Sequence, residues 1–439
     1  MRAAFFTLGC KTNAYETQAV LEQFRQAGFE IGEFGEPNDV YVINTCAVTK
    51  EASRKSRQMI GRCKRINPDA FVVVTGCYVQ EAADEILKNT GADIVVGNSE
   101  KAKIIDILNN REDRKHVKDL SRCREYEEQT ISDHKHHVRA YVKIQDGCDR
   151  FCSYCLIPYL RGRSRSRDKN LIISEAERLA GSGMKEIVLT GIDISSYDDG
   201  IKDDGLSLSR LIRDLGTIEG IERIRLGSLE VNIVSEELLR ELKDIGKFCP
   251  QFHLSLQSGS DTVLERMNRK YSTESYKNAV KLIRNTFPSA GITTDVIAGF
   301  PGETEEEHLE TKEFVREMAF SRMHVFPYSR REKTRADKMP GQLSAKIKEE
   351  RAGSLIAAGE EMRKEYEERL IDSCCEILAE EYVSDPHTGR TCVCGYTPEY
   401  VRIFADVSEY PGELTGKIIK VVPEEYKNGV LTGIIAVFP

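Results

Sequence analysis

Short apolar runs alternate with longer amphipathic stretches through the first 110 residues. Four runs are rich in β-branched and aromatic residues: RAAFFTL (2–8), DVYVINT (39–45), DAFVVVT (69–75) and ADIVVG (92–97). Each has the length of a strand, and helix-length polar segments separate them, which is typical of a parallel sheet with crossover helices. We therefore predict an N-terminal α/β domain over residues 1–110.

The alternation resumes after residue 138. The segment between, 111–138, is charged and lacks apolar periodicity, so it predicts a linker. Six candidate strands follow: RAYVKI (139–144), KEIVLT (185–190), RIRLGS (223–228), QFHLSL (251–256), ITTDVIA (292–298) and RMHVF (322–326). A polar or glycine-rich loop comes directly after each of them, as on the active-site face of a (β/α) barrel. A complete TIM barrel has eight strand–helix units. Six such units therefore predict an incomplete, open-sided TIM-like barrel over residues 139–370.

Residues 371–439 show a third pattern. The apolar runs 401–407, 416–422 and 431–438 are separated by turn residues and predict a small all-β module. The chain is thus expected to be of the α/β class, with a parallel-sheet domain, a partial barrel and a C-terminal β domain.

Thirteen cysteines are the compositional feature that changes this picture. No stretch is long and apolar enough to cross a membrane, and the first residues, MRAAFFTLGCKTNAYE, lack the pattern of a signal peptide. We therefore expect a cytoplasmic protein with no membrane partner. In a reducing compartment, cysteines in such number are more often metal ligands or catalytic groups than disulfide partners.

Cys148, Cys152 and Cys155 form a tight C-x3-C-x2-C motif in the loop after the first barrel strand. Three thiolates at this spacing suit an iron–sulfur cluster that keeps one iron free of protein ligands. The alternatives are a structural zinc site or core cysteines. A zinc site needs a fourth ligand nearby, and the histidines at 134, 136 and 137 precede the strand and so belong at its far end.

Cys10, Cys46 and Cys77 are far apart in sequence, yet each stands within two residues of the end of a candidate strand. Because the carboxyl ends of parallel strands lie along one edge of a sheet, these three thiols are expected to converge. The sequence therefore predicts a second three-thiolate site, with burial in the core as the alternative.

The tight motif, with Tyr154 before its last cysteine, resembles the signature of the radical S-adenosylmethionine (SAM) superfamily. The pattern TLGCKTN, NTCAVT and TGCY, followed by LSLQSGSD, MNRKY, DVIAGFPGETEEE and PYSRREKTRA, is similar to the methylthiotransferase family over nearly the whole chain. The resemblance implies two [4Fe–4S] clusters, one on each cysteine trio, and SAM as cofactor. It also implies SAM-binding roles for these residues: Tyr154, Gly191, Asp193, Glu230 and Gln257. The loop TGID replaces the commoner Gly-Gly-Glu of the superfamily.

Three branches of that family are candidates, acting on threonylcarbamoyladenosine in tRNA, on isopentenyladenosine in tRNA, or on a ribosomal-protein aspartate. The opening TLGCKTN and the segment HVFPYSRREKTRA resemble the first branch. That branch implies methylthiolation of C2 of the adenosine at position 37, with two SAM molecules and an electron donor such as flavodoxin or ferredoxin. A non-catalytic RNA-binding protein with structural metal sites is the alternative from another class.

Basic residues cluster around the tight cysteine motif, although the net charge of the whole chain is -8. Residues 139–169 hold eight basic and three acidic side chains, and alternate arginines on an extended loop suit a phosphate backbone. The predicted tRNA contacts are Arg161, Arg163, Arg165, Arg330 and Arg331. The C-terminal module resembles a TRAM domain but has eleven acidic and five basic residues, so bulk charge cannot bind RNA there.

Overall fold

The computed structural model of the 439-residue chain describes residues 1–132, 138–201, 205–386, 388–408, 410 and 412–436. Its N-terminal part is a six-stranded parallel sheet with the order β2-β1-β3-β4-β5-β6. The strands are β1 (Arg2–Thr7), β2 (Glu30–Ile31), β3 (Val40–Thr45), β4 (Phe71–Gly76), β5 (Ile94–Val96) and β6 (Lys115–His116). The helices are α1 (Lys11–Gln26), α2 (Lys50–Ile66), α3 (Cys77–Asn89) and α4 (Ile104–Asn109). The four strands predicted here are all present.

The central strands of this sheet are buried on both faces. Val72 and Val74 belong to one hydrophobic cluster, with α2 and α3, whereas Val73 belongs to another, with α1 and α4. Alternate side chains of one strand thus enter two cores, which explains the nearly continuous apolar runs in the sequence.

The middle of the chain forms the predicted open barrel from two parallel sheets, β11-β10-β7 and β12-β13-β14-β15, which a bridge between Ile224 and Phe248 joins. The strands are β7 (Arg139–Lys143), β10 (Glu186–Thr190), β11 (Arg223–Leu226), β12 (Ser228–Leu229), β13 (Gln251–Leu254), β14 (Gly291–Ala298) and β15 (Arg322–Pro327). The helices around them are α6 (Lys169–Gly181), α7 (Ser207–Gly216), α8 (Glu236–Lys243), α9 (Asp261–Arg266), α10 (Thr273–Thr286) and α11 (Glu305–Met318). Among the described residues, no strand pairing joins β7 to β15, so the barrel stays open.

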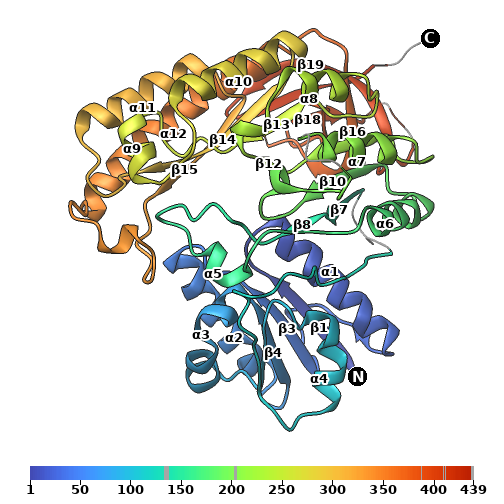
Figure 1. Cartoon of the computed structure of the whole chain (residues 1–439). Helices are drawn as coiled ribbons and strands as arrows, with labels where there is room; N and C mark the ends of the chain where they lie inside the picture. Colours follow the sequence, from blue (N-terminus) through green and yellow to red (C-terminus); the bar gives the residue numbers. More distant parts are fainter. Residues whose placement is uncertain (133–137, 202–204, 387, 409, 411, 437–439) are drawn as a thin grey trace.

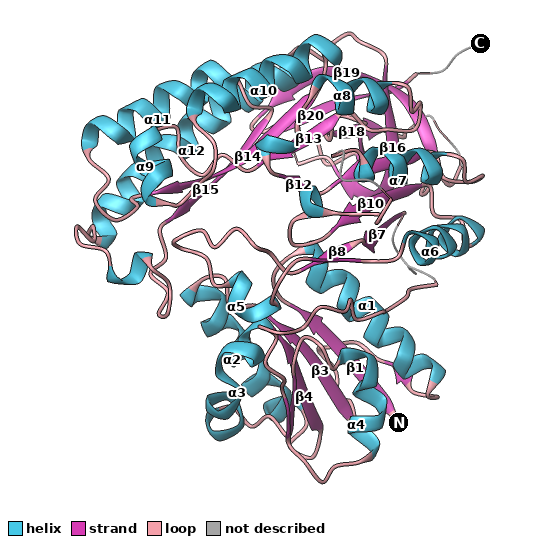
Figure 2. Ribbon diagram, in the orientation of Figure 1, coloured by secondary structure: helices cyan, strands magenta, loops and turns pink. Residues whose placement is uncertain are grey.

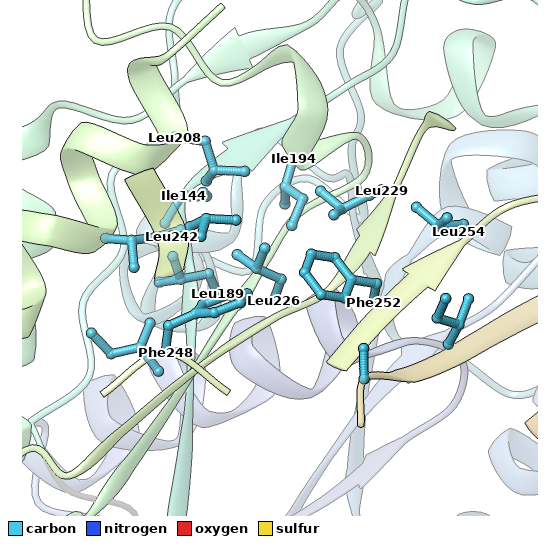
Figure 3. Packing of buried hydrophobic residues seen from close by; sticks show 14 of the residues in the cluster. Ile144, Leu189, Ile194, Leu208, Leu226, Leu229, Leu242, Phe248, Phe252 and Leu254 are labelled. Atoms are coloured by element: carbon cyan, nitrogen blue, oxygen red, sulfur yellow. The ribbon is translucent and has the colours of Figure 1, made fainter. Parts of the chain in front are cut away.

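One large apolar cluster holds this half-barrel together. Figure 3 shows Leu189 and Leu226 of neighbouring strands beside Phe252 of β13, with Leu242 and Leu208 contributed by the surrounding helices. These side chains are almost completely buried, and burial of such apolar area is the main favourable term in folding.

A long helix, α12 (Ala345–Glu368), packs along β15 and β14 and leads to a closed five-stranded barrel (Figures 1 and 2). Its order is β16-β17-β18-β20-β19. The strands are β16 (Cys375–Ser384), β17 (Thr391–Tyr396), β18 (Arg402–Asp406), β19 (Ile418–Lys427) and β20 (Val430–Ile435). The all-β prediction is confirmed, although β16 and β17 were not among the predicted strands. Residues 437 and 438 of the last predicted run lie outside the described residues.

The segment predicted as a linker packs, where it is described, against both neighbouring domains. β6 extends the N-terminal sheet, and Ile131 is buried in the barrel core. The carbonyl of Gln129 accepts a hydrogen bond from the Tyr15 hydroxyl at 2.6 Å. Most of the charged side chains in the described part of this segment are nevertheless exposed, and only a few of its residues are buried at the domain junction. The domain boundaries stay predictions, and the three histidines at 134, 136 and 137 lie outside the described residues. Within the described chain, no helix is long and apolar enough to span a membrane.

Candidate active site

The tight cysteine trio lies in the loop between β7 and a short helix, α5 (Ile157–Arg161). Burial, followed by the neighbouring Asp193 and Cys152, raises the pKa of Cys148 to about 12. Burial also raises the pKa of Cys155 to about 12, and the nearby Cys152 and Cys148 add to that effect. All three cysteines line one pocket. A bound metal stabilises the thiolate form that such an apolar setting disfavours.

Hydrogen-bond donors point at the sulfurs of this trio. Arg269 donates from Nη1 to Cys152 Sγ at 3.1 Å, and the backbone N–H of Ile157 donates to Cys155 Sγ at 3.4 Å. Donors to the ligand sulfurs are one of the means by which proteins tune iron–sulfur clusters.

A pocket opens directly beside the trio. Most of its lining comes from β12 and from the loops after β7, β10, β12 and β13, at the carboxyl ends of the strands, where a (β/α) barrel has its active site. The lining residues are Cys148, Arg150, Cys152, Tyr154, Cys155, Ile157, Ile192, Asp193, Ser228, Leu229, Glu230, Ser255, Gln257 and Arg269. Four of the five residues predicted to bind SAM are therefore gathered around the three cysteines.

Two arginines of this pocket were missed by sequence reasoning. Arg150 donates from Nε to Asp193 Oδ2 at 2.8 Å and lies 3.7 Å from Glu230 Oε1. Arg269 donates to Glu230 Oε2 at 2.5 Å. Sequence motifs could have pointed to both arginines, because Arg150 lies inside the cysteine motif and Arg269 lies inside MNRKY. Neither motif, however, reveals which carboxylate pairs with its arginine.

Gly191 is the predicted SAM residue that does not line the pocket. A Cβ at this position would lie 2.9 Å from the carbonyl oxygen of Gln145, so a side chain has no room. The next two residues, Ile192 and Asp193, donate their backbone N–H groups to Gln145 Oε1 at 3.0 and 2.8 Å. Gly191 thus lets the loop close onto Gln145 and turns Asp193 into the pocket.

Tyr154 and Gln257 reach the pocket by different means. The Tyr154 ring packs edge-on against Phe300, which belongs to the GFPGET turn. Gln257 has a φ of 69°, a left-handed conformation that is costly for a non-glycine residue and is concentrated at functional sites. Backbone hydrogen bonds with Asp295 and Ile297 of β14 hold it there.

The scattered trio converges at the carboxyl edge of the N-terminal sheet. Cys10 precedes α1, Cys46 directly follows β3, and Cys77 begins α3 directly after β4. Burial raises the pKa of Cys46 to about 11, with further contributions from Cys77 and Cys10, as expected for three neighbouring thiols. Gly9, at a φ of 108°, permits the approach, since its Cβ would lie 3.2 Å from Cys46 Sγ. The N-termini of α1 and α3 also favour negative charge at this edge.

The short helix α5, which follows the tight trio, lies at the junction between the sheet and the barrel (Figure 1). Leu156 and Leu160 bury their side chains in the core of the N-terminal domain. Arg161, at the end of the same helix, donates from Nε to Cys77 Sγ at 3.4 Å. The segment that leaves one trio therefore contacts the other.

Each trio offers the thiol donors that iron–sulfur clusters use. Across the described residues, no three His, Cys, Asp or Glu side chains are close enough to hold a single metal ion. A single zinc ion draws thiolates to about 2.3 Å from one point, whereas each thiolate on a cluster binds a separate iron. That each trio holds a cluster stays a prediction.

Three of the five arginines predicted to contact tRNA are buried. Arg161 ends α5 and pairs with Glu16, and Arg331 pairs with Glu81 of α3. Arg165 lies in a two-residue strand, β9 (Arg165–Ser166), and donates to the carbonyl of Arg161 at 2.9 Å. The expected row of arginines on an extended loop is wrong, because helix and strand geometry turn these side chains into a domain junction.

The other two arginines reach the surface. Arg163 pairs with Asp149 at 3.0 Å and covers the ring of Phe151, and nearly half of its side chain is exposed. Arg330 pairs with Asp337 in the loop after β15. Each lies within two residues of a buried arginine that pairs with the N-terminal domain, Arg161 with Glu16 and Arg331 with Glu81.

Residues 142–315 match the model of the Radical SAM superfamily, and residues 2–97 match the Uncharacterized protein family UPF0004. The chain is 41% identical to threonylcarbamoyladenosine tRNA methylthiotransferase MtaB of Bacillus subtilis, over 95% of this chain and 92% of that protein. It is 42% identical to the Aquifex aeolicus protein of the same name, over 89% and 97% of the two chains. The chain belongs to the radical SAM methylthiotransferase family. This confirms the resemblance found in the sequence motifs.

As a radical SAM methylthiotransferase, the chain is an enzyme whose cofactors are iron–sulfur clusters and SAM. It is also 34% identical to tRNA-2-methylthio-N6-dimethylallyladenosine synthase of Clostridium perfringens, over 95% of both chains. The fold is similar to that of the radical SAM methyltransferase TsrM from Kitasatospora setae, with a TM-score of 0.55, 14% identity, and coverage of 74% of this chain and 72% of that one. At that identity the likeness shows the fold alone.

Proposed function

We propose that this methylthiotransferase modifies C2 of N6-threonylcarbamoyladenosine at position 37 of tRNA. The observation that carries the proposal is that the helix directly after the tight trio reaches the scattered trio, with Arg161 of α5 against Cys77 of α3. Sulfur transfer to a short-lived carbon radical requires both sites in one cavity, because reacting groups must be held in near-attack geometry. The relatives named for threonylcarbamoyladenosine from B. subtilis and A. aeolicus are 41% and 42% identical, against 34% for the C. perfringens synthase.

In this proposal Cys148, Cys152 and Cys155 hold one [4Fe–4S] cluster, and Cys10, Cys46 and Cys77 hold the other. Held by Cys148, Cys152 and Cys155 and reduced, such a cluster would supply the electron for cleavage of SAM to a carbon radical. Two SAM molecules are used, one as the radical source and one as the methyl donor. An electron donor such as flavodoxin or ferredoxin and a cytoplasmic location complete the proposal.

The residues around the tight trio bind and orient SAM. Asp193 and Glu230 are carboxylates held in place by Arg150 and Arg269, and they are suited to accept hydrogen bonds from an ammonium group or ribose hydroxyls. Tyr154 closes the apolar side of the pocket against Phe300.

Nucleoside analysis tests the substrate. A bacterial strain without its own threonylcarbamoyladenosine methylthiotransferase is expected to regain the 2-methylthio form of that nucleoside when it produces this chain, as measured by mass spectrometry of digested tRNA. A methylthio group on isopentenyladenosine or on a ribosomal-protein aspartate instead would reassign the branch. Protein that binds RNA but leaves every nucleoside and that aspartate unmodified, and carries only zinc, would support the non-catalytic alternative.

The exposed arginine next to the tight trio is proposed to contact tRNA phosphate. Arg163→Ala is expected to weaken tRNA binding and to lower the slope of log K against log salt by about one, the value for one lost phosphate contact. Binding titrations at several salt concentrations measure this slope. Arg316→Ala is the matched control, since Arg316 is a similarly exposed, ion-paired arginine on α11. An unchanged slope for Arg163→Ala would remove it from the RNA footprint.

A further inference from the structure

Six charged side chains form a buried group beneath the N-terminal cysteine trio, at the junction of the sheet and the barrel. They are connected by ion pairs with N–O distances of 3.7 Å or less. The members of this group are Glu16, Lys101, Lys143, Asp146, Arg161 and Arg165, and each is at least nine-tenths buried. We call this set the junction charge cluster.

The junction charge cluster is not neutral. It contains four cations and two carboxylates, which leaves an excess of two positive charges. Although burial alone raises the pKa of Glu16, the charges of Arg161, Lys101 and Lys143 hold it well below its usual range, so Glu16 is ionised. The nearby carboxyl Glu127 has its pKa raised to about 7 by burial and contributes only part of a charge near neutral pH. Buried charge requires a counter-charge, because the interior solvates ions poorly.

The counter-charge that the structure offers is a cysteine sulfur. The Arg161 guanidinium is completely buried and uses all three of its nitrogens. Nη1 and Nη2 bind Glu16, Nη2 also donates to Asn13 Oδ1 at 2.7 Å, and Nε points at Cys77 Sγ at 3.4 Å. The thiol of Cys77 is the group on this face that becomes an anion when it binds a metal.

Arg161 also connects the loops of the other two cysteines. Asn13, which accepts from Arg161, donates its amide to the carbonyls of Leu8 at 2.7 Å and Thr45 at 3.1 Å. Leu8 lies in the loop that leads to Cys10, and Thr45 directly precedes Cys46. One guanidinium thus touches the third cysteine and, through one asparagine, the backbone beside the first and the second.

We propose that Arg161 is a positioning residue of the N-terminal trio, and that the excess positive charge of the junction charge cluster raises the reduction potential of the iron–sulfur cluster held there. The inference rests on the proposed function, in which Cys10, Cys46 and Cys77 are cluster ligands. Reduction makes a cluster more negative, and both nearby positive charge and donors to the sulfurs stabilise that state. Arg161 lies only six residues after Cys155, so one short helix fixes both sites.

The test measures a potential rather than activity. The full-length protein is reconstituted anaerobically with iron and sulfide, and the clusters are titrated with redox mediators under electron paramagnetic resonance. A parallel Cys152→Ala sample assigns the signal of the N-terminal cluster. In Arg161→Gln the oxidised-to-reduced ratio of that cluster at fixed potential is expected to rise about tenfold, which corresponds to about 59 mV for a one-electron couple.

Two further variants make the test specific. Arg161→Lys keeps the positive charge but loses the forked geometry of the guanidinium. The reduction potential of the N-terminal cluster is therefore expected to fall by less than in Arg161→Gln. If Arg161→Gln does not fold, the potential of Arg161→Lys tests the inference. Arg167→Gln is the matched control, because Arg167 is equally buried in the same segment but pairs with Glu128 and Glu175 and contacts no cysteine among the described residues. Its N-terminal cluster is expected to keep the wild-type potential.

The inference is overturned if the N-terminal cluster of a folded, iron-loaded Arg161 variant keeps the wild-type reduction potential. It is also overturned if Arg167→Gln lowers that potential as much as Arg161→Gln does. Failure of the proposed function looks different, since the wild-type protein would then assemble no iron on Cys10, Cys46 and Cys77. A variant at Arg161 that folds but no longer loads this trio, while Arg167→Gln still loads it, supports the positioning role.

Discussion

Cys152→Ala is expected to abolish cleavage of SAM and to lower the iron content from about eight to about four per chain, the content of one [4Fe–4S] cluster. Cys152 is the middle ligand of the tight trio and receives the hydrogen bond from Arg269. With two thiols left, the barrel site no longer holds a cluster and the electron for SAM cleavage has no source. Chromatography of 5′-deoxyadenosine and iron analysis after anaerobic reconstitution measure both effects.

Cys249→Ala controls for the loss of a thiol from the same domain. Cys249 is buried just before β13 and lies outside the pocket. Its replacement removes one core atom, at a cost of about 1 kcal/mol, which a typical domain stability of about 5–15 kcal/mol tolerates. Deoxyadenosine release and iron content are expected to match the wild type. Loss of all iron in Cys152→Ala would contradict two independent cluster sites.

Cys46→Ala is expected to separate the two halves of the reaction. The barrel site stays intact, so SAM is still cleaved, but the N-terminal trio loses a buried ligand and no methylthio group is transferred to tRNA. The expected result is deoxyadenosine without the 2-methylthio nucleoside, measured in the same reaction by mass spectrometry.

Cys63→Ala is the matched control for this variant. Cys63 is a fully buried cysteine of the same domain, and its thiol donates to the carbonyl of Met59 within α2. It is expected to retain both products. Methylthio transfer by Cys46→Ala at the wild-type rate would exclude the N-terminal trio from sulfur insertion.

Much of the fold could be predicted because local patterns already encode it. The strands of the N-terminal sheet and of the half-barrel are apolar runs of strand length, and β3, β4 and β14 occur within the residues predicted for them or one residue beyond. β16 was missed, since Glu376, Glu380 and Glu381 interrupt its apolar residues and break the pattern of a strand-length apolar run. The segment 111–138 stays a predicted linker, although its described part contributes β6 to the sheet and the buried Ile131 to the barrel core.

The sequence by itself determined the two cysteine trios. The tight trio is visible as spacing, and the scattered trio is visible because cysteines follow strands that are parallel, whose carboxyl ends must meet at one edge. The family resemblance singled out Asp193, Glu230 and Gln257, and their placement after barrel strands agrees with it, since loops after barrel strands share one face.

Only the tertiary structure decided which charges meet. Arg161, Arg163 and Arg165 are alike in sequence, yet α5 buries the first against Glu16 and Cys77, the strand β9 buries the third, and only the second reaches solvent. Arg150 and Arg269 likewise acquire their carboxylate partners from loops far along the chain. Ion pairing depends on distance and burial between segments that packing brings together, and the linear order of residues carries no such information.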